Sequence, residues 1–239
     1  MEEAMEESVN RRERKREKKR CEIVDAAEQL FFSQGYSNTT MDQIAEKSDL
    51  SKGAIYFYFK SKEEIFRYII LRTLSSFGTR INEAFEREES GIMKLYESGK
   101  AIKDFFNEDR NHFEVLFFHH FSQMGPISHS TLPIDESLDD QIKRETDKLI
   151  EKGREVILLG MRDGSIRSDI DPTLTLFTLH GMLIGLIRIA SMDEEYYLKH
   201  FNISFDNLVE TAFSVIGEAI EPHTHGVEAL SCDGKKVSH

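Results

Sequence analysis

The chain has 239 residues, and its balance of 39% hydrophobic and 31% charged residues excludes a wholly disordered protein. Its 14 glycines and 4 prolines are few, which favours an all-α fold over a turn-rich β-sandwich or barrel. The net charge of −12 argues, taken alone, against a nucleic-acid partner. The two cysteines, Cys21 and Cys232, lie too far apart in the sequence to suggest a disulfide framework or a zinc site.

Two features of the hydropathy pattern bear on where the protein is located. Met-Glu-Glu is followed by no apolar leader, so we expect no secretory signal and a cytoplasmic protein. The most apolar stretch, Thr173 to Ala190, is short for a membrane span and contains His180 and Arg188. We therefore expect no membrane partner.

The charge is distributed unevenly along the chain. Residues 1–10 carry four acids and no base, whereas residues 11–62 carry twelve Lys and Arg against eight Asp and Glu. A basic section joined to an acidic remainder is typical of a DNA-facing part on a soluble body, although a solvated, charged helix start would give the same counts.

The densest basic run, Arg11 to Arg20, reads RRERKREKKR. We expect residues 1–17 to form a disordered arm ahead of the first domain. Two interpretations of its bases stay open. They reach a minor groove or backbone phosphates, as basic N-terminal extensions do, or they extend the first helix and are solvated.

Apolar residues at helical spacing predict a first helix, which runs from Cys21 past Phe31 and ends at Gly35 in a left-handed C-cap. The capping box Thr40–Gln43 opens a short second helix, and a turn at residues 48–50 ends it.

Two further helix starts follow. Ser51 is placed to N-cap a helix over Lys52 to Phe59, and a second capping box, Ser61–Glu64, opens a long helix through about Phe85. Two short helices joined by a three-residue turn predict a helix-turn-helix.

The helix after the turn has an unusual outer face. Ile55 and Phe59 lie four residues apart and are expected to face the core, whereas Gly53 and Phe57 lie opposite them. Apolar and small residues on a solvated face suit a DNA groove. Lys52 is placed to donate to guanine, the apolar side chains to meet thymine methyl groups, and Lys62 to bind phosphate.

Here the sequence resembles a known family. The segment Gly35 to Phe66, GYSNTTMDQIAEKSDLSKGAIYFYFKSKEEIF, is similar to the helix-turn-helix of the TetR (tetracycline-repressor) family of transcriptional regulators. The resemblance spans roughly residues 18–78 and implies a DNA-binding domain there. It departs from the family at Asp49, where glycine is usual, and we expect a slightly strained turn because Asp tolerates a left-handed conformation. The implied DNA contacts are Thr40, Lys52, Gly53, Ala54, Tyr56, Phe57, Tyr58 and Lys62.

The remainder is expected to form a helical effector-binding and dimerisation domain over residues 79–221, followed by a disordered tail, 222–239. A long amphipathic helix is predicted over residues 138–162. Asp171 and Pro172 are an N-cap and first residue of the apolar helix near 172–192. The resemblance implies that this helix and one near 205–220 form a four-helix dimer interface, and the alternative is that both lie in a monomer core.

An aromatic-rich region is the candidate effector pocket, since ligand cavities are largely apolar with a few polar anchors. The alternative is that these residues form core, and that the lone His180 is a core or interface histidine. The paired histidines at 119–120 and at 223 and 225 lack further ligands, so no metal is predicted. The candidate pocket residues are Phe105, Phe106, His112, Phe113, Phe117, Phe121 and His180.

These observations predict a sequence-specific, dimeric transcriptional regulator, a repressor released from operator DNA by a small, largely apolar effector. The alternative is a DNA-bound regulator controlled by a protein partner. No serine elbow, HExxH, phosphate loop or dinucleotide fingerprint is present, so we predict neither enzyme activity nor a cofactor.

Overall fold

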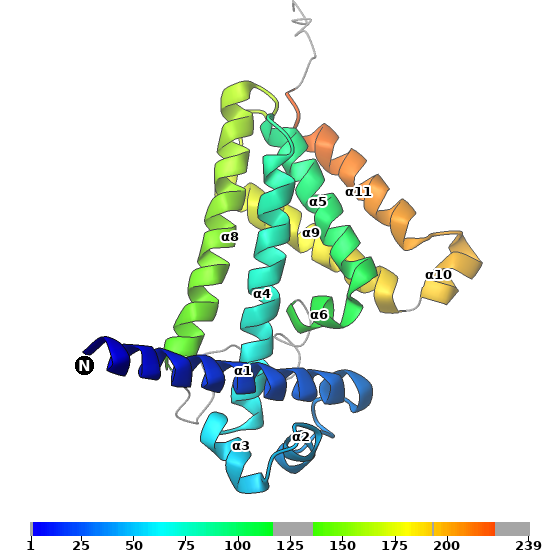
Figure 1. Cartoon of the computed structure of the whole chain (residues 1–239). Helices are drawn as coiled ribbons and strands as arrows, with labels where there is room; N and C mark the ends of the chain where they lie inside the picture. The colour runs from blue at the N-terminus through cyan, green and yellow to red at the C-terminus, as the bar shows by residue number, and fades with distance from the viewer. Residues whose placement is uncertain (1, 117–135, 193, 223–239) are drawn as a thin grey trace, which may run out of the picture. The chain divides into compact units, whose positions relative to one another are not determined.

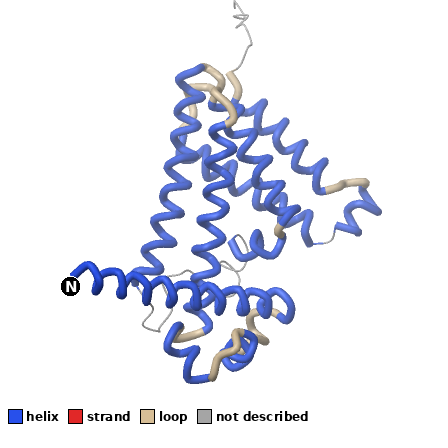
Figure 2. The backbone as a smooth tube through the Cα atoms, in the orientation of Figure 1, coloured by secondary structure: helices blue, strands red, loops and turns tan. Residues whose placement is uncertain are grey.

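A computed structural model describes residues 2–116, 136–192 and 194–222 (Figure 1). All regular secondary structure in these ranges is helix, joined by turns and loops, which confirms the predicted all-α fold (Figure 2). Residues 117–135 and 223–239 lie outside the described residues, and with them most of the expected tail. The helices are α1 (Glu2–Gln34), α2 (Met41–Lys47), α3 (Lys52–Tyr58), α4 (Lys62–Glu86), α5 (Gly91–Glu108), α6 (Arg110–Glu114), α8 (Glu136–Asp163), α9 (Pro172–Met192), α10 (Glu194–Phe201) and α11 (Phe205–Ile220).

The chain divides into two compact units. The first contains α1 to α4, the part of α5 from Glu97, α6, and α8 up to Gly153; the second contains the rest of α5 and α8 together with α9 to α11. The expected boundary between residues 78 and 79 falls inside α4, so the helix continues without a break where a domain border was predicted.

The core of the first unit joins α1 to the three helices after it. Apolar residues of α1 that recur at helical spacing pack against the inner faces of α2, α3 and α4; most are buried, and Leu30 and Phe32 are partly buried. The rings of Phe31, Tyr36 and Phe66 close one end of this core, with neighbouring centres 5.1 to 5.9 Å apart. The buried core residues include Ile23, Ala27, Phe31, Ile44, Ala45, Ile55, Phe59 and Ile65.

The helix boundaries correct two expectations. Helix α1 begins at Glu2, so residues 2–17 are helical and not a disordered arm, in agreement with the interpretation that the basic run extends the first helix. The capping box predicted at Ser61–Glu64 is only half formed. Ser61 accepts from the Glu64 amide as expected, but the Glu64 carboxylate accepts from the amide of Lys60.

The second unit is built around α9 and α11, which pack against each other. Asp171 caps α9 as predicted, since its carboxylate accepts from the amide of Leu174 at 2.8 Å. Gly91, at the start of α5, abuts the backbone of α8 at Gly160 so closely that a Cβ atom would collide with it. This contact explains why glycine begins α5. Helix α10, which the sequence did not predict, connects α9 to α11.

Candidate nucleic-acid interface

The turn between α2 and α3 is set by local hydrogen bonds. The Thr40–Gln43 capping box is complete: Thr40 accepts from the Gln43 amide, and the Gln43 side chain accepts from the Thr40 amide. Asp49 has φ of 54°, the left-handed conformation expected where the family usually has glycine. Ser51 then caps α3 by accepting from the amide of Ala54. The predicted helix-turn-helix is therefore present.

Helix α3 presents the face that its sequence predicted. Ile55 and Phe59 are 0% and 1% exposed and hold the helix to the core, whereas Tyr56 and Phe57 are 47% and 68% exposed. Gly53 is also exposed and has open space around it. Exposed aromatic rings cost free energy in water, so a face of this kind indicates a surface that is covered in the working complex.

Lys52 stands at the start of this face. Its ammonium donates to the Asp42 carboxylate at 2.7 Å, and both side chains are exposed. The hydrogen bond to Asp42 raises the pKa of Lys52 further above its ordinary value, so the group is cationic. The pair is solvated, and water or a competing acceptor therefore replaces Asp42 at little cost.

Lys62 is differently placed. Its ammonium donates to the backbone carbonyls of Tyr36 and Thr39, at 2.7 and 2.8 Å, and lies 4.2 Å from the centre of the Tyr36 ring. Lys62 is half-buried and braces the loop that leads into α2. Its proposed phosphate contact must therefore coexist with, or replace, these bonds.

Helix α1 contributes to this surface through contacts that its sequence did not predict. The guanidinium of Arg20 lies between two rings, 4.8 Å from the centre of Phe59 and 4.4 Å from that of Tyr68. One turn earlier, Arg16 lies 5.5 Å from the centre of the exposed Phe57 ring. The only signal in the sequence was the spacing of these arginines, which does not reveal distant partners.

Three of the candidate effector residues come together within the first unit. Phe105, Phe106 and Phe113 are buried and pack ring against ring, with centres 5.2 to 5.9 Å apart, as core residues do. His180 is exposed on α9, within the second unit, whereas the three phenylalanines belong to the first. Phe117 and Phe121 lie outside the described residues, so an apolar pocket around this cluster stays a prediction.

His112 belongs to a charged network. Its Nε2 lies 2.6 Å from Glu28 of α1, and its Nδ1 lies 2.5 Å from Asp109. Arg72 of α4 donates to Glu28 and to Asp25. The hydrogen bond to Glu28 is the main reason that the pKa of His112 is raised, against the opposing effect of burial. The network ties α6 to α1 and α4.

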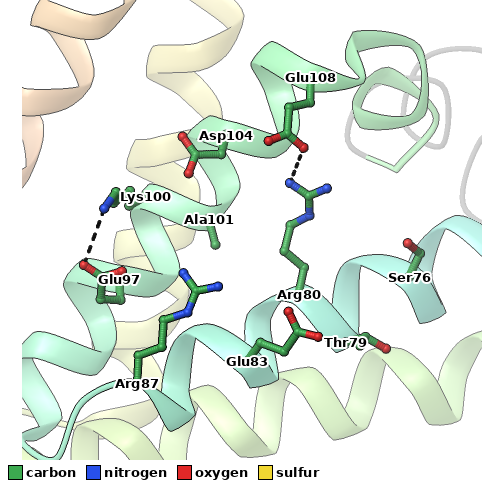
Figure 3. Close-up of a pocket in the computed structure, with 10 residues that line it drawn as sticks. All are labelled: Ser76, Thr79, Arg80, Glu83, Arg87, Glu97, Lys100, Ala101, Asp104 and Glu108. Carbon is green, nitrogen blue, oxygen red and sulfur yellow. Dashed lines mark hydrogen bonds and ion pairs between the residues drawn. The ribbon is translucent and has the colours of Figure 1, made fainter.

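A groove of about 500 Å³ lies between α4 and α5 within the first unit (Figure 3). Arg80 pairs with Glu108 across it at 2.7 Å, and Lys100 lies 3.9 Å from Glu97. Four carboxylates and three bases line it. Such a lining suits neither an apolar molecule nor an anion, so we assign it no effector.

The described residues contain neither a metal site nor a membrane span. No group of three or more His, Cys, Asp or Glu side chains in this part of the chain is arranged to hold a metal ion. No helix within these ranges is long and apolar enough to cross a bilayer.

A capped helix, a left-handed turn and a second helix that exposes Lys52, Tyr56 and Phe57 define a helix-turn-helix DNA-binding protein. Residues 23–69 match the family model described as bacterial regulatory proteins, tetR family. The helix-turn-helix domain of the chain belongs to this family of transcriptional regulators.

Similar proteins extend the likeness beyond the helix-turn-helix. The HTH-type transcriptional regulator YhgD of Bacillus subtilis is 27% identical over 165 residues, which cover 69% of this chain and 80% of that protein. The fatty acid metabolism regulator protein of B. subtilis is 23% identical over 183 residues, covering 75% and 87%. The structure of FadR from B. subtilis in complex with stearoyl-CoA superposes with a TM-score of 0.64 at 19% identity, covering 84% of this chain and 99% of that one. The fold is thus shared with regulators over most of the chain.

Proposed function

We propose that the protein is a dimeric repressor that binds an operator through α3 and leaves it when a small, largely apolar effector binds. The observation that carries the DNA-binding part is the exposed face of α3, with Lys52, Tyr56 and Phe57 outward while Ile55 and Phe59 anchor the helix. In a two-fold dimer, two such helices enter successive major grooves.

The exposed face of α9 supports dimerisation. Leu174 and Phe177 are 69% and 53% exposed, although α9 is the most apolar helix of the chain. Gly181 and Gly185 lie on the same face, and apart from their chain neighbours and the backbone of α9 itself no described atom comes within 4 Å of a Cβ placed on either. Glycines four apart allow close helix approach, and a second chain is placed to use that space. Val215 of α11 is also 55% exposed.

The effector part rests on similar proteins. A structural neighbour binds stearoyl-CoA, and a relative is a fatty acid metabolism regulator, so a long-chain acyl-CoA is the first effector to test. A ligand releases DNA only if it binds more tightly to the conformation that does not fit the operator, and the coupling is then reciprocal.

The alternative is a regulator controlled by a protein partner, with side chains filling the effector region. The packing of Phe105, Phe106 and Phe113 against one another favours this alternative, because rings in direct contact fill the space between them.

The first experiment is selection of bound fragments from sheared genomic DNA by the purified protein, followed by footprinting. We expect an inverted repeat protected at one or a few loci. Salt-sensitive retention of DNA with no preferred sequence would contradict the proposed function.

A thermal-shift measurement then tests the effector. Stearoyl-CoA should raise the melting temperature and release the selected fragment, because a ligand of the native state stabilises it. Free CoA, which lacks the acyl chain, is the matched control. If no small molecule changes either quantity, and a protein that releases the fragment is found instead, the alternative is correct.

A further inference from the structure

Three contacts fix which side of α1 faces the helix-turn-helix. Arg16 lies over Phe57, the ammonium of Lys19 donates to the Ser48 carbonyl at 3.1 Å, and Arg20 stacks on Phe59. Positions 16, 19 and 20 are spaced by three and four residues, so they share one face of the helix.

This face continues toward the N-terminus of the helix. Helix α1 extends in that direction past α3 (Figure 1). Arg12 lies one turn before Arg16 and therefore points to the same side, whereas Arg14 and Lys18 lie about 160° around the helix from Arg16. Arg12, Arg14, Arg16 and Lys18 are all exposed.

Two cations on this face have acidic partners, Lys19 with Glu22 at 2.9 Å and Arg20 with Glu64 at 3.6 Å, whereas those nearer the N-terminus have none among the described residues. Arg12 and Lys15 have no carboxylate partner among the described residues, and Arg16 contacts a ring and not an acid. Glu17, by contrast, lines a groove with Tyr68 and Arg72, on the flank toward α4. Apart from Glu13, which lies three residues before Arg16, the side chains of residues 12–20 on the side of α1 nearest the recognition helix are cations.

We propose that Arg12 and Arg16 form a second DNA-contacting surface, which binds backbone phosphates flanking the half-site that α3 reads. Guanidinium groups match phosphate oxygens in two-point hydrogen bonds, and exposed arginines without acidic partners lose little on binding them. Phe57, over which Arg16 lies, is the most exposed ring of α3, so this side of α1 adjoins the proposed reading surface. This inference rests on the proposed DNA-binding function.

The test compares two variants of equal charge. Arg12→Ala/Arg16→Ala removes two cations from the proposed face, and Arg14→Ala/Lys18→Ala removes two from the opposite face. For each variant, the affinity for DNA is measured as a function of KCl concentration on two duplexes. One carries the selected repeat with about one helical turn of flanking DNA on each side, and the other is trimmed to the repeat. The first variant should reduce the slope of log Kd against log salt by about 0.9 for each phosphate that it no longer neutralises. The second should leave the slope unchanged, and trimming should abolish the difference.

Two results would overturn the proposal: an equal reduction of the slope in both variants, which indicates long-range charge alone, or no reduction in either. Arg12→Ala by itself keeps the test independent of α3, because Arg12 touches nothing there, and it should give part of the slope change. If wild-type protein shows no preference for the repeat, the proposed function fails instead, and the two faces are still compared on an unrelated duplex.

Discussion

At the scale of single residues, two lysines near the recognition helix have different tasks. Lys52 is exposed and held only by a solvated pair with Asp42, whereas Lys62 donates to two backbone carbonyls under the Tyr36 ring. Removing Lys62 therefore leaves polar groups of the loop without a charged donor.

We expect Lys62→Ala to lower the free energy of unfolding by about 1–3 kcal/mol, because hydrogen bonds from charged donors in a half-buried site contribute in that range. It should also weaken binding to all DNA sequences alike. Lys52→Ala should leave the melting temperature unchanged and relax base preference. Denaturant unfolding measures the stability of both variants, and binding to operator and unrelated duplexes measures their affinity and base preference. Equal melting temperatures for Lys62→Ala and wild type would contradict the bracing role.

Asp49 offers a second test at this scale. Its φ of 54° is costly for a side chain branched at Cβ and free of strain for glycine. Asp49→Val should lower the free energy of unfolding by about 1–2 kcal/mol, whereas Asp49→Gly should change it by less than about 1 kcal/mol. Thermal unfolding of the two variants decides this, and a Val variant as stable as the Gly variant would show that the turn adopts another conformation.

At the scale of elements, the contact between α6 and α1 depends on one proton. Both ring nitrogens of His112 face carboxylate oxygens, and only the imidazolium has two N–H groups to donate. The raised pKa of His112 agrees with this geometry. Because the folded pKa lies above the ordinary value of 6.5, the stabilisation is complete below pH 6.5 and is lost as the pH rises through the folded pKa.

We therefore expect His112→Gln to lower the melting temperature by a few degrees at pH 6, corresponding to about 1–2 kcal/mol, and by progressively less at higher pH. Glu28 stays ionised over this range: burial opposes its ionisation, but its hydrogen bonds to His112 and Arg72 outweigh burial and lower its pKa. His200→Gln, an exposed position on α10, is the matched control and should show no such trend. A deficit for His112→Gln that does not vary with pH would mean that the histidine is neutral.

Elements set by local interactions were predictable from the sequence. The Gly35 C-cap, the Thr40–Gln43 capping box and the Ser51 cap join residues within four positions of one another, so a single sequence reveals them. The contacts that shape the site were not predictable in this way. His112 and Glu28 are 84 residues apart, and Lys62 and the Tyr36 carbonyl 26, and no periodicity reports such pairs.

The same limit applies to the helices that follow the DNA-binding domain. An all-round apolar pattern correctly predicted α9 but not which side of it stays uncovered within one chain. That side is defined by the packing of α11 on another face, which leaves Leu174 and Phe177 exposed. The aromatic residues Phe105, Phe106 and Phe113 were predicted to line a pocket or to form core, and composition does not separate these two outcomes, because both bury rings.

At the scale of the whole molecule, the proposed function requires two copies, since one α3 reads only one half-site. The face of α9 that would join them carries Gly181, around which a side chain has free space among the described residues. A substitution there distinguishes folding from association. Replacing glycine in a helix stabilises the helix by up to about 1 kcal/mol, whereas a long polar side chain obstructs a close helix partner.

We expect Gly181→Gln to be as helical as wild type and at least as stable at low protein concentration, but to be monomeric by light scattering at concentrations where wild type is a dimer. Its affinity for the full inverted repeat should fall toward that for a single half-site, because linked binding of two recognition helices no longer occurs. Affinity for a half-site duplex is the control and should not change. If Gly181→Gln stayed dimeric and bound the repeat as tightly as wild type, the two copies would have to meet through a surface other than this face of α9.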